Sequence, residues 1–212
     1  MANLITLSRL LLLIAVVALA YRPPSIWQLL NVPLLILVFV SDGLDGYVAR
    51  KRNETSLFGA MFDIAGDRIV ELSMWIVLAD LDLVPVWIPL VFVIRGVIVD
   101  TIRASTAQQT GQKPFEMLRG PVARWLVAGK FMRIFYAVIK AVVFCWLLLI
   151  YPLPAIAPAL WSDWGWLLAG IGQGLALLTV CICVLRGLPV VIEFVYSQRE
   201  AILHAGAQQR EP

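Results

Sequence analysis

The sequence predicts an all-α integral membrane protein with six transmembrane helices, and two observations support this fold class. First, 61% of the 212 residues are apolar or aromatic, well above the roughly 45–50% usual in soluble domains. Second, only 15% are charged, against about 25% in soluble domains, so too few polar side chains remain to cover a water-exposed surface. The mean hydropathy of +0.87 agrees with both. An ordinary soluble globular protein is therefore excluded.

Six apolar runs, each long enough to cross a bilayer, account for most of the chain. They cover approximately residues 3–21, 27–50, 57–79, 84–106, 121–150 and 164–196. The last two are longer than a simple span requires, so we expect those helices to project beyond the hydrocarbon. Because the runs leave no room for a separate soluble domain, we expect residues 1–212 to form one membrane domain.

The connections between the runs differ sharply in basic residues. The short connections on one side contain a single basic residue, Arg22, whereas those on the other side and the C-terminal tail contain many. The positive-inside rule then places both termini and the basic links in the cytoplasm. The alternative for the first run is a signal peptide ending in the A-x-A sequence at residues 18–20. The small net charge of +3 and the scattered basic residues argue against a nucleic-acid partner.

An unusual set of acidic residues lies where the second and third runs meet. On the second run, four residues fall at helical positions i, i+3, i+4 and i+7: Asp42, Asp45, Gly46 and Ala49. On the third run, three residues follow at intervals of four: Gly59, Asp63 and Asp67. Residues at these spacings share one face of a helix. The link between the runs is short and polar, so the two helices must be antiparallel neighbours whose four carboxylates can converge.

Converging carboxylates need a counter-charge. Four of them repel one another, and a carboxylate at bilayer depth costs roughly 2.5 kcal/mol or more. Two divalent cations would neutralise them, and paired metals serve in-line displacement at phosphorus. All-oxygen ligation favours Mg²⁺ or Mn²⁺ over zinc. The small residues on the same faces let a ligand approach the backbone, and Arg50 is placed to meet a phosphate. The alternative is a polar helix interface or an ion-conducting acidic cluster.

Residues 42–67 read D-x2-D-G-x2-A-R-x8-G-x3-D-x3-D, which resembles the signature of the CDP-alcohol phosphatidyltransferase family at every defining position. The resemblance implies a six-helix membrane enzyme, usually a homodimer, that displaces CMP from a CDP-linked lipid with an alcohol. It further implies that Asp42, Asp45 and Asp63 are metal ligands, and that Asp67 completes the metal cluster and acts as general base on the acceptor hydroxyl. By the same likeness, the residues that frame the CDP moiety are Gly46, Ala49, Arg50 and Gly59.

Charged residues in the fourth and fifth runs suggest where an acceptor binds. They are Arg95, Arg103, Lys130 and Arg133. Together they predict a basic pocket on the cytoplasmic side, suited to a phosphorylated alcohol. Other charges in the runs are expected to have structural partners.

Two such structural pairings are expected. Glu71 is expected to pair with Arg68 or Arg95. Lys140 is expected to reach a carboxylate or the membrane interface.

Several details resemble the phosphatidylglycerophosphate synthase subgroup of that family. Asn3, Thr6 and Arg9 match its N-x-x-T-x-x-R pattern, and Arg95, Arg103 and the pair Gly129-Lys130 also follow it. This likeness implies transfer of a phosphatidyl group from CDP-diacylglycerol to glycerol 3-phosphate. The expected location is the bacterial cytoplasmic membrane, with the active site facing the cytoplasm.

The acceptor stays open at this stage, because Gly96 stands where the subgroup usually has a glutamate and residues 131–133 depart from its pattern. Inositol phosphate, serine and phosphatidylglycerol are the alternative acceptors. A catalytically silent family member is a further alternative. From another class, a cation-coupled transporter could use the aspartate cluster, but it would release no CMP.

Overall fold

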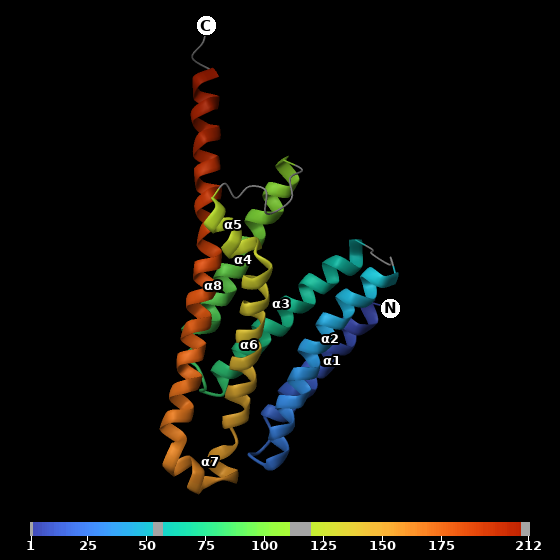
Figure 1. Cartoon of the computed structure of the whole chain (residues 1–212), viewed down its shortest axis with the longest axis vertical. Helices are drawn as coiled ribbons and strands as arrows, with labels where there is room; N and C mark the ends of the chain where they lie inside the picture. The colour runs from blue at the N-terminus through green and yellow to red at the C-terminus, as the bar shows by residue number, and fades with distance from the viewer. Residues whose placement is uncertain (1, 53–56, 111–119, 209–212) are drawn as a thin grey trace. The chain divides into compact units, whose positions relative to one another are not determined.

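The structure is a computed structural model that describes residues 2–52, 57–110 and 120–208 (Figure 1). Within these ranges side chains are described except at residues 2–5, 42–52, 57, 58, 60, 107–110, 121, 122 and 198–208. Every regular element in the described ranges is a helix, and none is a strand. The expected all-α class is confirmed for this part of the chain.

The first four predicted runs each contain one long helix. These are α1 (Ala2–Ala20), α2 (Asn31–Arg52), α3 (Leu57–Asp80) and α4 (Trp87–Thr110). Pro23 and Pro24 follow α1 and cannot continue it. A short 3₁₀ helix, η1 (Ile26–Leu30), leads directly into α2, so the second run bends at its start.

The fifth run differs from the expectation of one long projecting helix. It contains two helices, α5 (Pro121–Ala128) and α6 (Lys130–Ile150), which are separated at Gly129. The backbone of Gly129 is extended, with φ −58° and ψ 130°. A Cβ atom there would lie only 2.2 Å from the carbonyl oxygen of Trp125. The break therefore depends on a close backbone approach that only glycine allows.

The sixth run extends further than expected. After the short α7 (Leu153–Ile156), α8 runs over Pro158–Gln208, which is 51 residues or about 76 Å at 1.5 Å per residue. That length exceeds the roughly 30 Å of a bilayer's hydrocarbon core.

Two segments, Lys130–Ile156 and Pro158–Ser197, are long and apolar enough to cross a membrane. The helices α3 and α4 carry charged residues within their apolar stretches. The full six-span topology stays a prediction.

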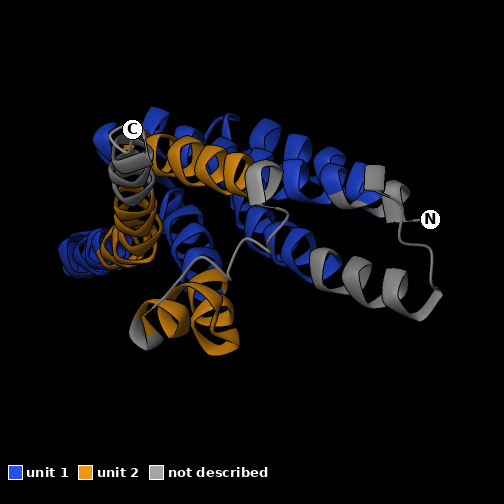
Figure 2. Cartoon of the chain, turned by 90° about the horizontal axis from the view of Figure 1, so that it is seen from above, with its two compact units in different colours: residues 1–89, 138–177 blue, residues 90–137, 178–212 orange. Residues whose placement is uncertain are grey.

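The chain divides into two compact units (Figure 2). Unit 1 comprises Met1–Pro89 and Val138–Leu177, and in it α1 packs against α2 and α3. The indole of Trp75, fully buried, meets the ring of Phe144 edge-on with 4.8 Å between centroids. At one end of α1, the Tyr21 hydroxyl donates a hydrogen bond to Asp80 at the end of α3. The contact between Tyr21 and Asp80 joins α1 to α3, the helix that carries Asp63 and Asp67.

Unit 2 comprises Leu90–Ala137 and Leu178–Pro212. Its core is a buried apolar cluster from α4, α5 and α8: Val99, Ile102, Val127 and Val190. Because α5 contributes to this core, the break at Gly129 allows the chain to pack α5 separately from α6.

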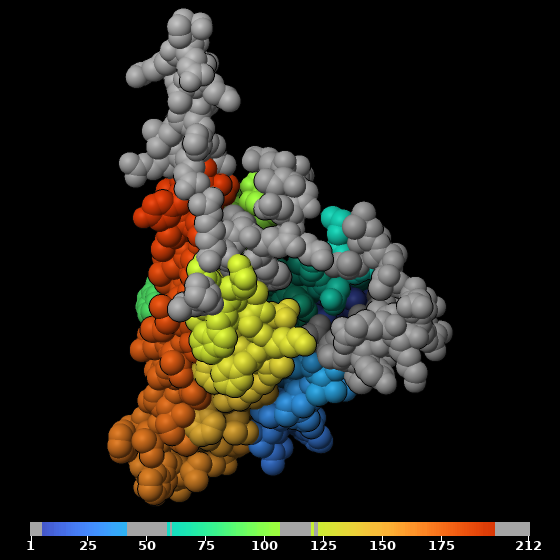
Figure 3. Space-filling view, turned by 45° about the horizontal axis from the view of Figure 1, so that its top comes forward, coloured from blue at the N-terminus to red at the C-terminus, as the bar shows by residue number. Residues whose placement is uncertain are grey.

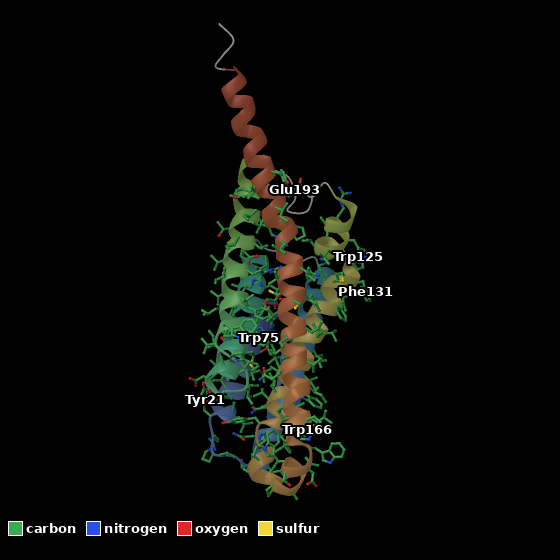
Figure 4. The ribbon with its side chains drawn as sticks, turned by 90° about the vertical axis from the view of Figure 1, so that its left-hand side faces the viewer. Tyr21, Trp75, Trp125, Phe131, Trp166 and Glu193 are labelled. Atoms are coloured by element: carbon green, nitrogen blue, oxygen red, sulfur yellow. The ribbon has the colours of Figure 1, made fainter. Side chains whose placement is uncertain are left out.

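Large apolar side chains are exposed on both units. Phe131 and Ile134 are each 65% exposed on α6, which is yellow at its start in Figure 3. Trp166 of α8 is 76% exposed and points outward, whereas Trp75 lies inside unit 1 (Figure 4). Such extensive apolar surface suits contact with lipid rather than water.

Candidate active site

The backbone positions of the predicted signature residues are helical. The last turns of α2 carry five of them, whose side chains lie outside the described part: Asp42, Asp45, Gly46, Ala49 and Arg50. The other three, Gly59, Asp63 and Asp67, lie on α3. The helical spacing assumed for both groups is therefore confirmed, whereas convergence of all four carboxylates stays a prediction.

Asp63 and Asp67 meet the same cation. Arg9 of α1 donates a hydrogen bond from Nη2 to Asp67 Oδ1 at 2.5 Å, and its Nη1 lies 3.6 Å from Asp63 Oδ1. The Arg9 side chain is only 2% exposed, whereas those of Asp63 and Asp67 are 46% and 52% exposed. A buried guanidinium thus joins two carboxylates that also face outward.

The contact between α1 and α3 is unusually close at this point. A Cβ atom on the buried Gly66 would lie 2.8 Å from Thr6 Cγ2 and 3.8 Å from Arg9 Nη2. Thr6 itself is 2% exposed. Glycine between the two aspartates therefore lets α1 approach near enough for Arg9 to reach both. In the structure, Thr6 and Arg9 of the N-terminal N-x-x-T-x-x-R pattern therefore lie against this stretch of α3.

This arrangement fits a divalent cation chemically. Two carboxylates on one helix face already share a positive group, and their oxygen atoms are the donors that Mg²⁺ and Mn²⁺ prefer. Among the described side chains, no group of three or more His, Cys, Asp or Glu residues gathers. The expected cluster of four requires Asp42 and Asp45, whose side chains are outside that set.

Glu71, one turn beyond Asp67, belongs to a separate ion-pair network in unit 1. Its Oε2 lies 3.1 Å from Arg68 Nη1, and its Oε1 lies 2.9 Å from Lys140 Nζ. The expected pairing with Arg68 is confirmed, and Lys140 reaches a carboxylate as expected. Glu71 is only 8% exposed and both of its carboxylate oxygens have a cationic partner, so this network connects α3 to α6.

Three arginines from different helices lie near one another in unit 2. Arg95 of α4 and Arg133 of α6 are close enough to Arg186 of α8 for their charges to interact with it. Arg186 is 6% exposed, donates from Nη2 to the carbonyl oxygen of Val127 at 3.2 Å, and stacks 5.3 Å from the ring centre of Tyr136. Its Nε and Nη1 are buried with no hydrogen-bond partner among the described residues. Three cations gathered in this way are suited to an anion.

A glycine also makes room in this cluster. A Cβ atom on Gly187 would lie 2.9 Å from Arg95 Cγ and 3.2 Å from its Nε. The Nε of Arg95 is likewise buried with no hydrogen-bond partner among the described residues. The other two predicted acceptor residues lie on α4 and α6. Arg103 is two turns beyond Arg95 along α4 and has a buried Nε, and Lys130 is exposed at the start of α6.

The model of one protein family matches residues 1–169, most of the chain, and its description is CDP-alcohol phosphatidyltransferase. The chain belongs to this family. Members of the family are membrane-bound and use divalent metal ions. The match includes α2 and α3 with the whole aspartate signature, and it confirms the resemblance seen in the sequence.

Several relatives are similar over part of the chain. A CDP-diacylglycerol–glycerol-3-phosphate 3-phosphatidyltransferase of Bacillus subtilis is 32% identical over 43% of this chain and 47% of its own length. One of the same name from Rickettsia typhi is 34% identical over 32% of this chain and 38% of its own. A cardiolipin synthase (CMP-forming) of Streptomyces coelicolor is 41% identical over 32% of this chain and 31% of its own length. The chain thus spans about half or less of the length of these relatives.

Sequence reasoning missed Arg186, although a signal for it was present. It is the single charged residue between Asp163 and Glu193, in the apolar run of α8, and Gly187 and Pro189 follow it closely. An ionisable residue inside a membrane-crossing segment is a functional candidate by default. Gly66 gave no such signal, because only its contact with α1 makes it necessary.

Proposed function

We propose that this protein transfers a phosphatidyl group from CDP-diacylglycerol to a small alcohol, with glycerol 3-phosphate as the acceptor, and releases CMP. The observation that carries the proposal is the pair Asp63 and Asp67 of α3, two residues of the family's aspartate signature that both contact Arg9 of α1. The names of the Bacillus and Rickettsia relatives support the choice of acceptor.

The residues proposed to hold two Mg²⁺ or Mn²⁺ ions are Asp42, Asp45, Asp63 and Asp67. Bound there, the ions would draw negative charge from the pyrophosphate of the CDP-lipid. Gly46, Ala49 and Gly59 would leave room for the CDP moiety, and Arg50 would contact its phosphate.

Asp67 is the proposed catalytic residue of a direct displacement. The acceptor hydroxyl oxygen attacks the phosphorus that carries the diacylglycerol, and the bond from that phosphorus to the CMP oxygen breaks. The hydroxyl proton passes to the Asp67 carboxylate, and the electron pair of the broken bond leaves with CMP. No covalent enzyme intermediate is required, which suits a chain whose single histidine, His204, lies in the C-terminal tail.

The arginines of unit 2 are proposed to bind the acceptor's phosphate. Arg95, Arg133 and Arg186 supply planar guanidinium groups, which bind phosphate oxygens through paired hydrogen bonds. Arg103 and Lys130 complete the proposed acceptor site. This cluster favours a phosphorylated acceptor over serine, and among phosphorylated alcohols the relatives favour glycerol 3-phosphate.

The proposal places the enzyme in the bacterial cytoplasmic membrane as a homodimer, with one membrane domain over residues 1–212 and the active site facing the cytoplasm. The basic links between the apolar runs support this orientation. The exposed apolar residues on both units support membrane lipids as neighbours.

The test is an acceptor panel with purified protein in detergent micelles. CDP-diacylglycerol and Mg²⁺ are supplied with glycerol 3-phosphate, inositol phosphate, serine or phosphatidylglycerol, and both CMP and the lipid product are measured by mass spectrometry. Fastest turnover is expected with glycerol 3-phosphate. Fastest turnover with phosphatidylglycerol would instead assign the activity named for the Streptomyces relative. No CMP with any acceptor would overturn the proposal and leave the transporter alternative.

Two carboxylate variants on α3 connect this activity to the site. Asp63→Asn is expected to reduce CMP release by about 10²-fold or more, since a metal ligand is lost. Asp80→Asn changes a carboxylate of the same helix that pairs with Tyr21 instead, and it should retain wild-type turnover.

A further inference from the structure

Arg186 is a buried cation that leaves part of its guanidinium group without a partner. It lies on α8 in a segment that is long and apolar enough to cross a membrane, and it is only 6% exposed. Its Nη2 donates to the carbonyl oxygen of Val127, but its Nε and Nη1 are buried with no hydrogen-bond partner among the described residues. Buried charged donors are costly to leave unpaired. An anionic ligand would satisfy them, so the orientation of this group matters for binding.

The carbonyl oxygen of Val127 can reach Arg186 because the helix is broken two residues later. In a continuous α-helix this oxygen would accept a hydrogen bond from the N–H of Phe131, four residues further on. Gly129 interrupts the helix with φ −58° and ψ 130°, so α5 and α6 are separate helices. At the break, the oxygen accepts a hydrogen bond from Arg186 Nη2 at 3.2 Å.

A second contact, from α6, orients the plane of the same guanidinium group. The Cζ atom of Arg186 lies 5.3 Å from the ring centre of Tyr136, which is within the range of a cation–π contact. Tyr136 is 8% exposed, so this contact is shielded from solvent. The Val127 carbonyl and the Tyr136 ring, together named the Arg186 socket, thus come from the two helices on either side of the break. All three residues belong to unit 2.

The socket acts against repulsion between cations. Arg95 and Arg133 lie close enough to Arg186 for their charges to interact with it. Like charges repel, so an unrestrained Arg186 side chain would turn away from the other two. A carbonyl oxygen and the electron-rich face of an aromatic ring both attract a cation. The socket therefore keeps Arg186 beside Arg95 and Arg133, where the three charges can act on one anion.

We propose that the Arg186 socket, which the helix break at Gly129 creates, positions Arg186 so that its remaining donors meet the phosphate of the acceptor. Gly129, Val127 and Tyr136 are positioning residues, because they act through Arg186. The inference rests on the proposed function, which assigns the acceptor's phosphate to this arginine cluster. It gives the break a role in acceptor binding beyond the separate packing of α5 and α6.

The experiment measures binding of glycerol 3-phosphate to the full chain in micelles by isothermal titration calorimetry. Gly129→Ala cannot keep the present backbone, because its Cβ would lie 2.2 Å from the carbonyl oxygen of Trp125. A helical residue 129 relieves this clash and returns the Val127 oxygen to a backbone partner, so Arg186 loses its anchor and the Kd should rise about tenfold. The control Gly174→Ala adds a Cβ that meets nothing within 4 Å and should leave the Kd unchanged.

A double-mutant cycle tests whether the break acts through Arg186. Arg186→Gln should by itself raise the Kd about tenfold. Adding Gly129→Ala to Arg186→Gln should then change the Kd by less than about twofold, because the anchored side chain is already absent. Independent damage to the site, such as a shift of Lys130 or Arg133, would instead multiply the two increases to about 100-fold. That result overturns the inference.

A pair of variants at position 136 tests the socket from α6 and does not depend on the folding of Gly129→Ala. Tyr136→Phe keeps the ring face, so its Kd for glycerol 3-phosphate should stay within about twofold of the wild type. Tyr136→Leu removes the ring face and should raise the Kd about fivefold. This increase should vanish in the Arg186→Gln background. Equal Kd values for the two Tyr136 variants overturn the inference.

The binding measurement separates this inference from the proposed function, because it needs no turnover. A wild type that binds glycerol 3-phosphate but releases no CMP overturns the proposed function, while the cycle still tests the socket. In an active enzyme, Gly129→Ala should raise the KM for glycerol 3-phosphate while the KM for CDP-diacylglycerol changes little. Equal increases in the two KM values overturn the socket alone. A wild type that neither binds glycerol 3-phosphate nor turns it over overturns both.

Discussion

Replacing Gly66 by alanine tests the packing that brings Arg9 to the aspartates. The added Cβ would lie 2.8 Å from Thr6 Cγ2, whereas ordinary contacts lie at 3.4–4 Å. Thr6 is buried and β-branched, so it has few rotamers into which it can retreat. Either Thr6 or α1 must shift by several tenths of an ångström, and overpacking of this kind costs about 1–3 kcal/mol.

A matched control is needed because alanine is also a better helix former than glycine, by about 1 kcal/mol. Gly174 in α8 provides it, since a Cβ atom there meets nothing within 4 Å. The helix-propensity gain is common to Gly66→Ala and Gly174→Ala and cancels when the two are compared. Gly174→Ala should be neutral or stabilising. Gly66→Ala should unfold at a temperature roughly 2–12 °C below that of Gly174→Ala for a chain of this size.

The assay is thermal unfolding in micelles combined with CMP release. Displacement of α1 by part of an ångström should also weaken the contact between Arg9 and Asp67, so Gly66→Ala should lose turnover as well as thermal stability. Thr6→Ser removes the opposing methyl group, and in the double variant it should restore part of both quantities. The reasoning is refuted if Gly66→Ala has the same unfolding temperature and turnover as Gly174→Ala. It is also refuted if adding Thr6→Ser to Gly66→Ala lowers the unfolding temperature further instead of raising it.

Three further predictions concern other parts of the chain. The hydrogen bond to Asp80, with smaller effects of burial and of the Asp80 charge, raises the pKa of Tyr21 from 10.0 to about 12. The stabilisation from this hydrogen bond should therefore be complete below pH 10 and lost between pH 10 and 12. The melting temperature of the wild type should fall across that range, and this part of the fall should be absent in Tyr21→Phe. In steady-state kinetics, Arg186→Gln should raise the KM for glycerol 3-phosphate about tenfold or more while the KM for CDP-diacylglycerol changes little. Equal increases in the two KM values would argue against an acceptor site. Single cysteines at Thr55 and Asp82, in a cysteine-free background, should label from opposite sides of the membrane, and labelling of both from outside would contradict the predicted topology.

Local spacing explains why part of the site could be predicted. Asp63 and Asp67 are four residues apart, so any helix over this stretch places them on one face, and Arg9 indeed contacts both. Glu71 and Arg68 are three apart and pair as expected. The break at Gly129 was missed because an isolated glycine is tolerated inside many helices, and its extended backbone becomes evident only from the structure.

The sequence by itself determined the helical class, the apolar character and the aspartate signature, because composition and helical periodicity are local properties. Only the tertiary structure decided which helix faces meet. Arg9 lies 58 residues from Asp67, and the need for glycine at position 66 arises only when α1 packs there. Arg186 likewise joins Arg95 and Arg133 from distant helices. Periodicity specifies the residues that share a face, but the partner of that face depends on packing among helices that are all apolar, and this packing brings the charges together.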